Sequence, residues 1–121
     1  MKALRRLGYL LPGLAALVIA WWGVRELRIQ ALMQAARDGR ITGVGRMLDS
    51  GMDVNTRTFS GWTPLLVAVS AGQTETVRYL VGRGADRRAR IDFKQKSALR
   101  LARDFHHQDT EALLVAMGCR E

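Results

Sequence analysis

The sequence predicts an all-α protein in which an N-terminal transmembrane helix is followed by a short solenoid of about three helical repeats. Three observations support this prediction. Residues 7–24 carry no charged side chain, and the rest of the chain matches itself at a spacing of 33 or 34 residues. In that remainder, glycines stand at the ends of apolar patterns with helical spacing.

The size and charge of the chain limit what it can do. It has 121 residues and a formal charge of +8, so it holds one small domain with little room for an enclosed active site. The basic excess favours acidic partners, namely an acidic protein face, anionic lipid headgroups or nucleic acid, although a solvated surface has the same composition. Nucleic acid is disfavoured because the basic residues do not follow a known nucleic-acid-binding fold.

The first segment has the features of a membrane anchor. Residues 1–6 form a basic tail, and residues 7–24 would make about 27 Å of helix, close to the hydrocarbon thickness of about 30 Å. Trp21 and Trp22 lie at the C-terminal end of the segment, where indole rings favour the headgroup region. A basic tail followed directly by the apolar run is typical of a signal-anchor, which favours a cytoplasmic N-terminus and a repeat domain outside.

Two alternatives stay open for this segment. A cleaved signal peptide would have Val18 and Ala20 as the small residues before the cut, but two tryptophans follow directly. A buried core helix would need apolar cover on all sides, which a chain of this length does not supply. The orientation stays open as well, because further arginines follow the apolar run.

Small residues share one face of the predicted anchor. Gly13, Ala16, Ala20 and Gly23 are spaced three, four and three residues apart, which would let a partner helix approach closely. Glycine and alanine are also common in membrane helices generally, so the same spacing arises without a helix partner.

The rest of the chain contains an internal repeat. At an offset of 33, residues 35–39 align with residues 68–72, and at an offset of 34, residues 63–65 align with residues 97–99. One residue is therefore added in the connection around residues 90–96. This period is typical of stacked helical hairpins, none of which buries its apolar face alone.

The middle unit shows how its helices are specified. Thr63 is a good N-cap, and Pro64 suits the first helical turn, where its missing N–H costs nothing. Gly72 ends the first helix, Thr74 begins a second one, and Gly84 ends it.

This unit is similar to an ankyrin repeat. The resemblance is carried by Gly61, Thr63-Pro64-Leu65, Ala68, Gly72, Glu75, Val77, Leu80 and Gly84-Ala85-Asp86, and by Gly51-Met52-Asp53-Val54-Asn55 in the first unit. It covers residues from about 30 to 119. It implies a repeat domain over residues 25–121, with units of about 25–57, 58–91 and 92–121.

The outer units depart from the family pattern. The first has Gln30-Ala31-Leu32 where Thr-Pro-Leu is expected, so its opening helix should continue the preceding helix without a cap. The last has Gln95 in place of a glycine, His106 in place of the turn glycine and Arg120 in place of an aspartate. Atypical end units are expected, because each has one face without a neighbouring repeat.

No catalytic, cofactor-binding or metal-binding residue is predicted. The run from Asp104 to Asp109 contains both histidines, but it lacks paired cysteines or a His-x-x-x-His face and is expected to be a solvated turn. Gly43-x-Gly45 has neither the preceding strand nor the following Gly-Lys-Ser/Thr of a phosphate loop. We therefore expect a protein without enzymatic activity.

The resemblance implies that partners bind the loops between units and the first helix of each pair. Aromatic and arginine side chains there match the composition of protein interfaces. The candidate contact residues are Phe59, Trp62, Arg87, Arg88, Arg90, Phe93, Lys94, Lys96 and Phe105. Phe59 and Trp62 could instead pack on neighbouring units, and the charges could simply be solvated.

Together these observations predict a membrane-anchored protein-interaction scaffold that uses no cofactor. The alternative is a structural element at the membrane surface, in which the basic segment from Arg87 to Lys96 lies against anionic lipid headgroups.

Overall fold

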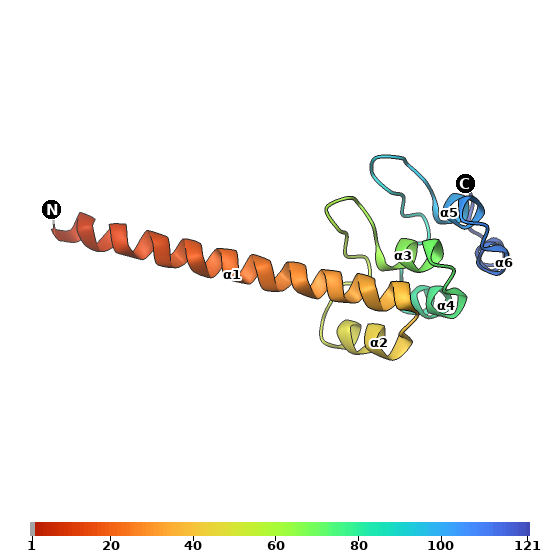
Figure 1. The fold of residues 1–121 in the computed structure, drawn as a ribbon, viewed down its shortest axis with the longest axis horizontal. Coiled ribbons are helices and arrows are strands. Elements are labelled where there is room, and N and C mark those ends of the chain that lie inside the picture. The colour runs from red at the N-terminus through yellow and green to blue at the C-terminus, as the bar shows by residue number, and fades with distance from the viewer. Residues whose placement is uncertain (1) are drawn as a thin grey trace.

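The computed structural model describes the backbone of residues 2–121 and the side chains of residues 12–121. Its helices are α1 (Lys2–Asp38), α2 (Ile41–Asp49), α3 (Pro64–Ser70), α4 (Thr74–Gly82), α5 (Ala98–Asp104) and α6 (Gln108–Ala116). They form three successive pairs at one end of the molecule, and the N-terminal part of α1 projects away from them (Figure 1).

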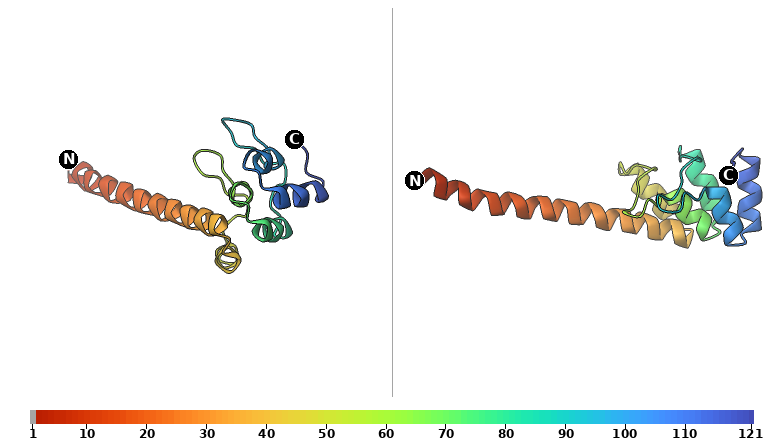
Figure 2. Two further views of the ribbon diagram at one scale, coloured as in Figure 1. Left: turned by 45° about the vertical axis from the view of Figure 1, so that its right-hand side comes forward. Right: turned by 90° about the horizontal axis from the view of Figure 1, so that it is seen from above.

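The helix pairs stack in two layers. In one layer α3 lies between α1 and α5 and contacts both, and in the other α4 lies between α2 and α6. Figure 2 shows the same order from two further directions, with the α2–α3 and α4–α5 loops projecting beside each other. The predicted all-α repeat solenoid of about three units is confirmed.

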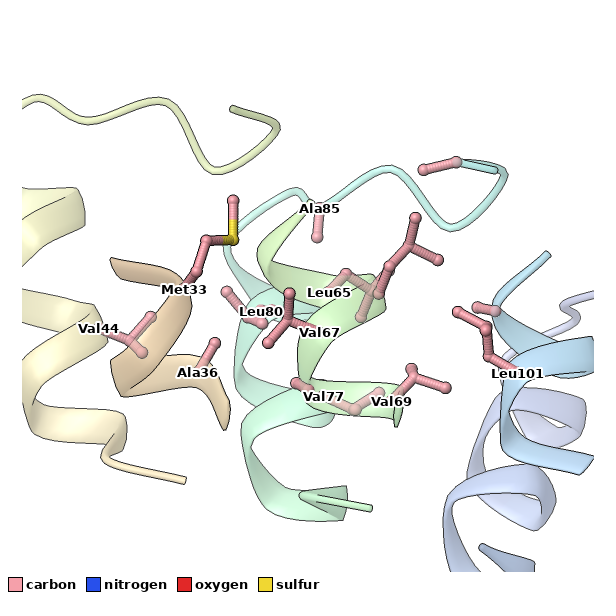
Figure 3. Packing of buried hydrophobic residues seen from close by; sticks show 14 of the residues in the cluster. Met33, Ala36, Val44, Leu65, Val67, Val69, Val77, Leu80, Ala85 and Leu101 are labelled. Atoms are coloured by element: carbon pink, nitrogen blue, oxygen red, sulfur yellow. The ribbon is translucent and has the colours of Figure 1, made fainter. Parts of the chain in front are cut away.

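The core lies between the layers and runs through all three pairs. Ala35, Ala68 and Ala102 occupy corresponding positions of α1, α3 and α5, and each is almost completely buried. Their small side chains let neighbouring helices approach closely, while Leu65 and Leu80 fill the space inside the middle pair (Figure 3). Each pair therefore depends on its neighbours for apolar cover.

The predicted cap at Thr63 is present, and Ser97 caps α5 in the same way. Thr63 Oγ1 accepts a hydrogen bond from the N–H of Leu66 at 3.3 Å, and Ser97 Oγ accepts one from Arg100 at 3.2 Å. Both hydroxyls satisfy amide groups that have no partner within the first helical turn. Each cap fixes the point where a loop enters the stack.

Two of the three turns inside the helix pairs contain glycine, and the third has a histidine at the same place. Gly39, Gly72 and His106 occupy the same place and have φ of 72°, 69° and 58°. A Cβ at Gly39 would lie 2.5 Å from Gln73 Oε1, and a Cβ at Gly72 would lie 2.6 Å from His107 Nδ1. The first two turns need glycine both for φ and for the close approach of the next pair. His106 is exposed, and no further pair in the described chain is stacked on its turn.

The N-terminal helix corrects the prediction of a membrane anchor. Among residues 12–121, no helix is long and apolar enough to cross a membrane. The predicted transmembrane helix over residues 7–24, and with it the single-pass membrane localisation, is therefore wrong. Residues 7–11 of that segment lie outside the described side chains.

Within the described chain, the N-terminal part of α1 has no packing partner. The helix continues unbroken into the first pair, as the missing cap at residues 30–32 predicts. Large apolar side chains from Leu14 to Leu27 are exposed, and burial begins at Ile29. A Cβ at Gly13 or Gly23 would meet nothing within 4 Å, so a helix partner for that face stays a prediction.

Loss of one core leucine tests the dependence of the pairs on one another. Leu80 has no exposed surface, and Leu80→Ala should lower the free energy of unfolding by about 2–5 kcal/mol. Thermal unfolding followed by circular dichroism should show one transition at a lower temperature. Val115→Ala, at an exposed position of α6, is the control and should change stability by less than about 0.5 kcal/mol. Equal effects of the two substitutions would contradict the stacked core.

The turn analysis predicts opposite effects at equivalent positions. His106→Gly should stabilise the protein by about 0.5–1 kcal/mol, because glycine removes the strain of a positive φ. Gly72→Ala should destabilise it strongly, because the new methyl group meets both that strain and the His107 ring. Chemical unfolding of the two variants measures both effects, and a destabilised His106→Gly would show that the imidazole itself supports the fold.

Candidate protein interface

Two exposed phenylalanines lie at equivalent positions in the projecting loops. In the α2–α3 loop, a turn from Thr58 to Gly61 is closed by the bond from the N–H of Gly61 to the carbonyl oxygen of Thr58 at 3.0 Å. In the α4–α5 loop, the N–H of Gln95 donates to the carbonyl oxygen of Ile91 at 2.7 Å and closes a turn of one more residue. Phe59 and Phe93 lie at aligned positions of these two turns and are 98% and 81% exposed. Neither ring serves the core, although each is large enough to anchor a contact.

Arg57 joins the two loops. Its Nη1 lies 3.2 Å from the carbonyl oxygen of Gly61, 3.1 Å from that of Arg90 and 3.3 Å from Asp92 Oδ1. A Cβ at Gly61 would lie 2.9 Å from the backbone nitrogen of Asp92, so the two turns touch backbone to backbone. The guanidinium and this close approach fix the spacing between Phe59 and Phe93.

Trp62 and Lys96 occupy equivalent positions after the two turns, but neither is freely exposed. Trp62 is half-buried and packs against the hydrophobic core. Lys96 forms an ion pair with Asp104, which Arg100 Nε also approaches at 3.2 Å. These two cations hold the pKa of the Asp104 carboxyl below its usual value, with the Lys96 hydrogen bond as the main cause.

The base of the α4–α5 loop and the end of the chain enclose a basic hollow of about 690 Å³. Four arginines line it, together with Met117, Cys119, Glu121 and two small residues; the arginines are Arg87, Arg88, Arg90 and Arg120. Arg87 Nη1 donates to the carbonyl oxygen of Met117 at 2.7 Å and so ties the loop to the C-terminal segment. Burial raises the pKa of the Cys119 thiol, against the opposing effect of Arg87.

A second hollow, of about 290 Å³, adjoins the first and shares Arg90, Ser97 and Glu121 with it. Lys94, Gln95, Lys96 and Arg100 complete its lining. Glu121 is paired with Arg103. The two hollows therefore form one basic trough, lined by the arginines and lysines already named.

The structure does not bring every candidate residue together. Phe93, Lys94, Lys96 and the arginines lie in or beside the α4–α5 loop, but Phe105 caps the opposite end of α5, where its ring stacks on His107 at 6.3 Å. His107 Nε2 in turn lies 3.0 Å from the carbonyl oxygen of Ser70. Among the residues that the structure describes, no three His, Cys, Asp or Glu side chains converge as metal ligands would.

Comparison with known proteins now identifies this architecture. A family model described as "Ankyrin repeats (3 copies)" matches residues 31–120. The chain belongs to the ankyrin-repeat family. Ankyrin repeats are in general binding modules for protein partners rather than enzymes.

Curated relatives share the repeats within longer chains. The mitochondrial disaggregase of Bos taurus is 38% identical over 85 residues, 70% of this chain and 12% of its own. Human protein phosphatase 1 regulatory subunit 27 is 39% identical over 64 residues, 53% of this chain and 42% of its own. The chain thus spans less than half the length of these relatives.

A solved structure shows the same fold. A chain in the complex "Bd0816 Predatory Endopeptidase from Bdellovibrio bacteriovorus in complex with immunity protein Bd3460" superposes with a TM-score of 0.69 at 24% identity. The match covers 74% of this chain and 47% of that one.

Sequence reasoning missed three residues of this ankyrin surface, namely Arg57, Arg100 and Arg120. Arg57 and Arg100 had no signal of their own, because their roles depend on contacts with Asp92 and Asp104. Arg120 was noted as standing where the family has an aspartate, and that departure was the available clue.

Removal of the Arg57 side chain should loosen the link between the loops. In Arg57→Ala, the amides of Ile91 and Gln95, which donate to Lys96 and Ile91, should lose hydrogen-exchange protection, while the amide of Leu80 should keep it. The stability loss should be about 1 kcal/mol, as for a partly exposed charged hydrogen bond. Arg46→Ala, at an exposed position on α2, is the control. Unchanged protection of Ile91 and Gln95 would show that the loops hold their places without Arg57.

Proposed function

We propose that this ankyrin domain is a protein-binding scaffold whose contact surface is centred on the α2–α3 and α4–α5 loops. The observation that carries the proposal is the pair Phe59 and Phe93, two almost fully exposed rings at equivalent positions of adjoining loops. Exposed apolar groups that serve no packing role inside a chain often mark interaction sites. Aromatic side chains are also common binding hot spots.

Physical features of the loops support this surface. Arg57 and the close approach at Gly61 hold the turns at a fixed spacing, so ordering the loops would take little of the binding free energy. Lys94 follows Phe93, and the basic trough adjoins the same loop, which suits a partner with an acidic rim. Phe105, at the far end of α5, lies outside this surface. Trp62 packs on the hydrophobic core beneath the α2–α3 loop. The substitution Trp62→Ala would therefore change stability as well as binding.

Site-specific cross-linking tests the surface. The photoreactive residue p-benzoylphenylalanine would replace Phe59, Phe93 or, as a control, Val115, which is exposed on α6. Positions 59 and 93 should yield the same protein adduct in cells, and position 115 should not. With that partner purified, Phe59→Ala and Phe93→Ala should each weaken binding about 30-fold, since a hot spot contributes about 2 kcal/mol.

The unfolding temperature of each variant separates binding from folding. Both phenylalanines are exposed, so their truncation should leave thermal unfolding unchanged while binding falls. The same adducts from position 115, or variants that bind as tightly as the original protein, would contradict the proposed surface.

A further inference from the structure

We propose that the basic trough beside the C-terminal end of the stack binds an extended acidic peptide segment of a partner protein. This inference rests on the proposed function and assigns a second, separate contact to the same partner. The trough consists of the larger hollow lined by Arg87, Arg88, Arg90 and Arg120 and the adjoining one that reaches Lys94.

The charges in the trough are not balanced by the protein itself. Among the described residues, Asp92, Asp104, Glu111 and Glu121 are each paired with an arginine or lysine. Glu121 lines the larger hollow, but its side-chain carboxylate forms an ion pair with Arg103. No carboxylate of the described chain pairs with Arg87, Arg88, Arg90, Lys94 or Arg120 at salt-bridge distance. Several cations held close together without counter-charges favour an anionic ligand.

Two of the four arginines are held in place by the fold, and the other two are not used by it. Arg87 and Arg90 donate to backbone carbonyl groups of Met117 and Gln95, which fixes their side chains in place. Arg88 and Arg120 are exposed, and neither side chain makes a hydrogen bond to the described residues. A guanidinium group can bind a carboxylate through two parallel hydrogen bonds.

The shape and lining of the trough distinguish among anionic ligands. The larger hollow, about 690 Å³, is concave and lies between a loop and the chain end, so a flat bilayer surface does not enter it. None of the residues that line either hollow is aromatic, whereas single-stranded nucleic acids bind largely by stacking on aromatic side chains. Two adjoining hollows with cations along both fit a chain that carries several carboxylates better than one small anion.

Fluorescence anisotropy of fluorescein-labelled hexaglutamate, titrated with the full chain, tests the inference. Arg88→Ala combined with Arg120→Ala should weaken binding at least tenfold at 50 mM NaCl. Arg37→Ala combined with Arg46→Ala is the matched control, since it removes two exposed arginines from α1 and α2. The control should change the dissociation constant less than twofold. Equal weakening by both pairs would show nonspecific attraction to net charge and overturn the site.

Cys119 provides a second readout. It is the single cysteine of the chain and lines the larger hollow, so saturating hexaglutamate should slow its alkylation by N-ethylmaleimide at least threefold. The slowing should vanish in the Arg88→Ala, Arg120→Ala variant. Unchanged alkylation of the original protein at saturation would place the peptide elsewhere and overturn the proposal.

Two competing ligands complete the experiment. Vesicles with 30% phosphatidylserine and a dodecathymidine strand should bind more weakly than hexaglutamate at equal charge concentration, and tighter binding of either would overturn the peptide assignment. Cross-links from positions 59 and 93 without hexaglutamate binding would contradict the trough as a binding site and leave the loop surface supported. Hexaglutamate binding without those cross-links would contradict the loop surface instead.

Discussion

The close stacking of helix pairs is the constraint on which the rest of this structure depends. A seven-residue helix such as α3 or α5 is too short to persist alone in water, and no pair buries its own apolar face. The almost complete burial of Ala35, Ala68 and Ala102 shows how near the helices of the inner layer come to one another. Larger side chains there would separate the pairs and remove the apolar cover that each receives from its neighbour. The loops inherit their positions from this stack, since each is fixed at both ends by a helix that is itself fixed by packing.

The same closeness decides where glycine is required. Gly61 and Gly72 have positive φ and also face the next pair, where Asp92 and His107 leave no room for a Cβ. The last pair repeats the backbone conformation with Gln95 at φ 48° and His106 at φ 58°, but no pair in the described chain covers it. There the backbone strain alone opposes a side chain, and Gln95 offsets part of it by donating from Nε2 to the carbonyl oxygen of Asp92 at 2.9 Å. The degenerate repeat is therefore a consequence of its place at the edge of the stack.

The features that the sequence predicted well are those that depend on local chemistry and on period. Thr63 and Pro64 start a helix wherever such a pair stands before an apolar pattern, and the offset of 33 or 34 residues fixes which segments stack. Contacts between units were not predictable in this way, because the link from Arg57 to Asp92 joins residues that share no motif. The sequence also left open which aromatic side chains are exposed. Phe59 and Trp62 are only three residues apart, yet Phe59 is solvated and Trp62 packs on the core. The anchor prediction rested on the missing charge of residues 7–24, and among the described residues no helix is long and apolar enough to cross a membrane.

The loops combine a fixed backbone with free side chains, and this combination is what a binding surface requires. Asp53 and Asp86 each accept a hydrogen bond from the amide two residues later at 2.9 Å, and Asn55 Oδ1 accepts one from the amide of Asp86 at 2.7 Å. These bonds, together with Arg57, use polar side chains to order the backbone and leave Phe59, Phe93, Arg88 and Arg120 without a structural role. Side chains that make no contact within the fold stay free to bind a partner. The conformational entropy of the loop backbone has already been lost on folding, so binding does not lose it again. The Phe93 turn lies in the α4–α5 loop, which also lines the basic trough. A single partner that places an apolar group against Phe93 can therefore reach the trough with an adjoining acidic segment, so that the second contact forms at a high effective concentration.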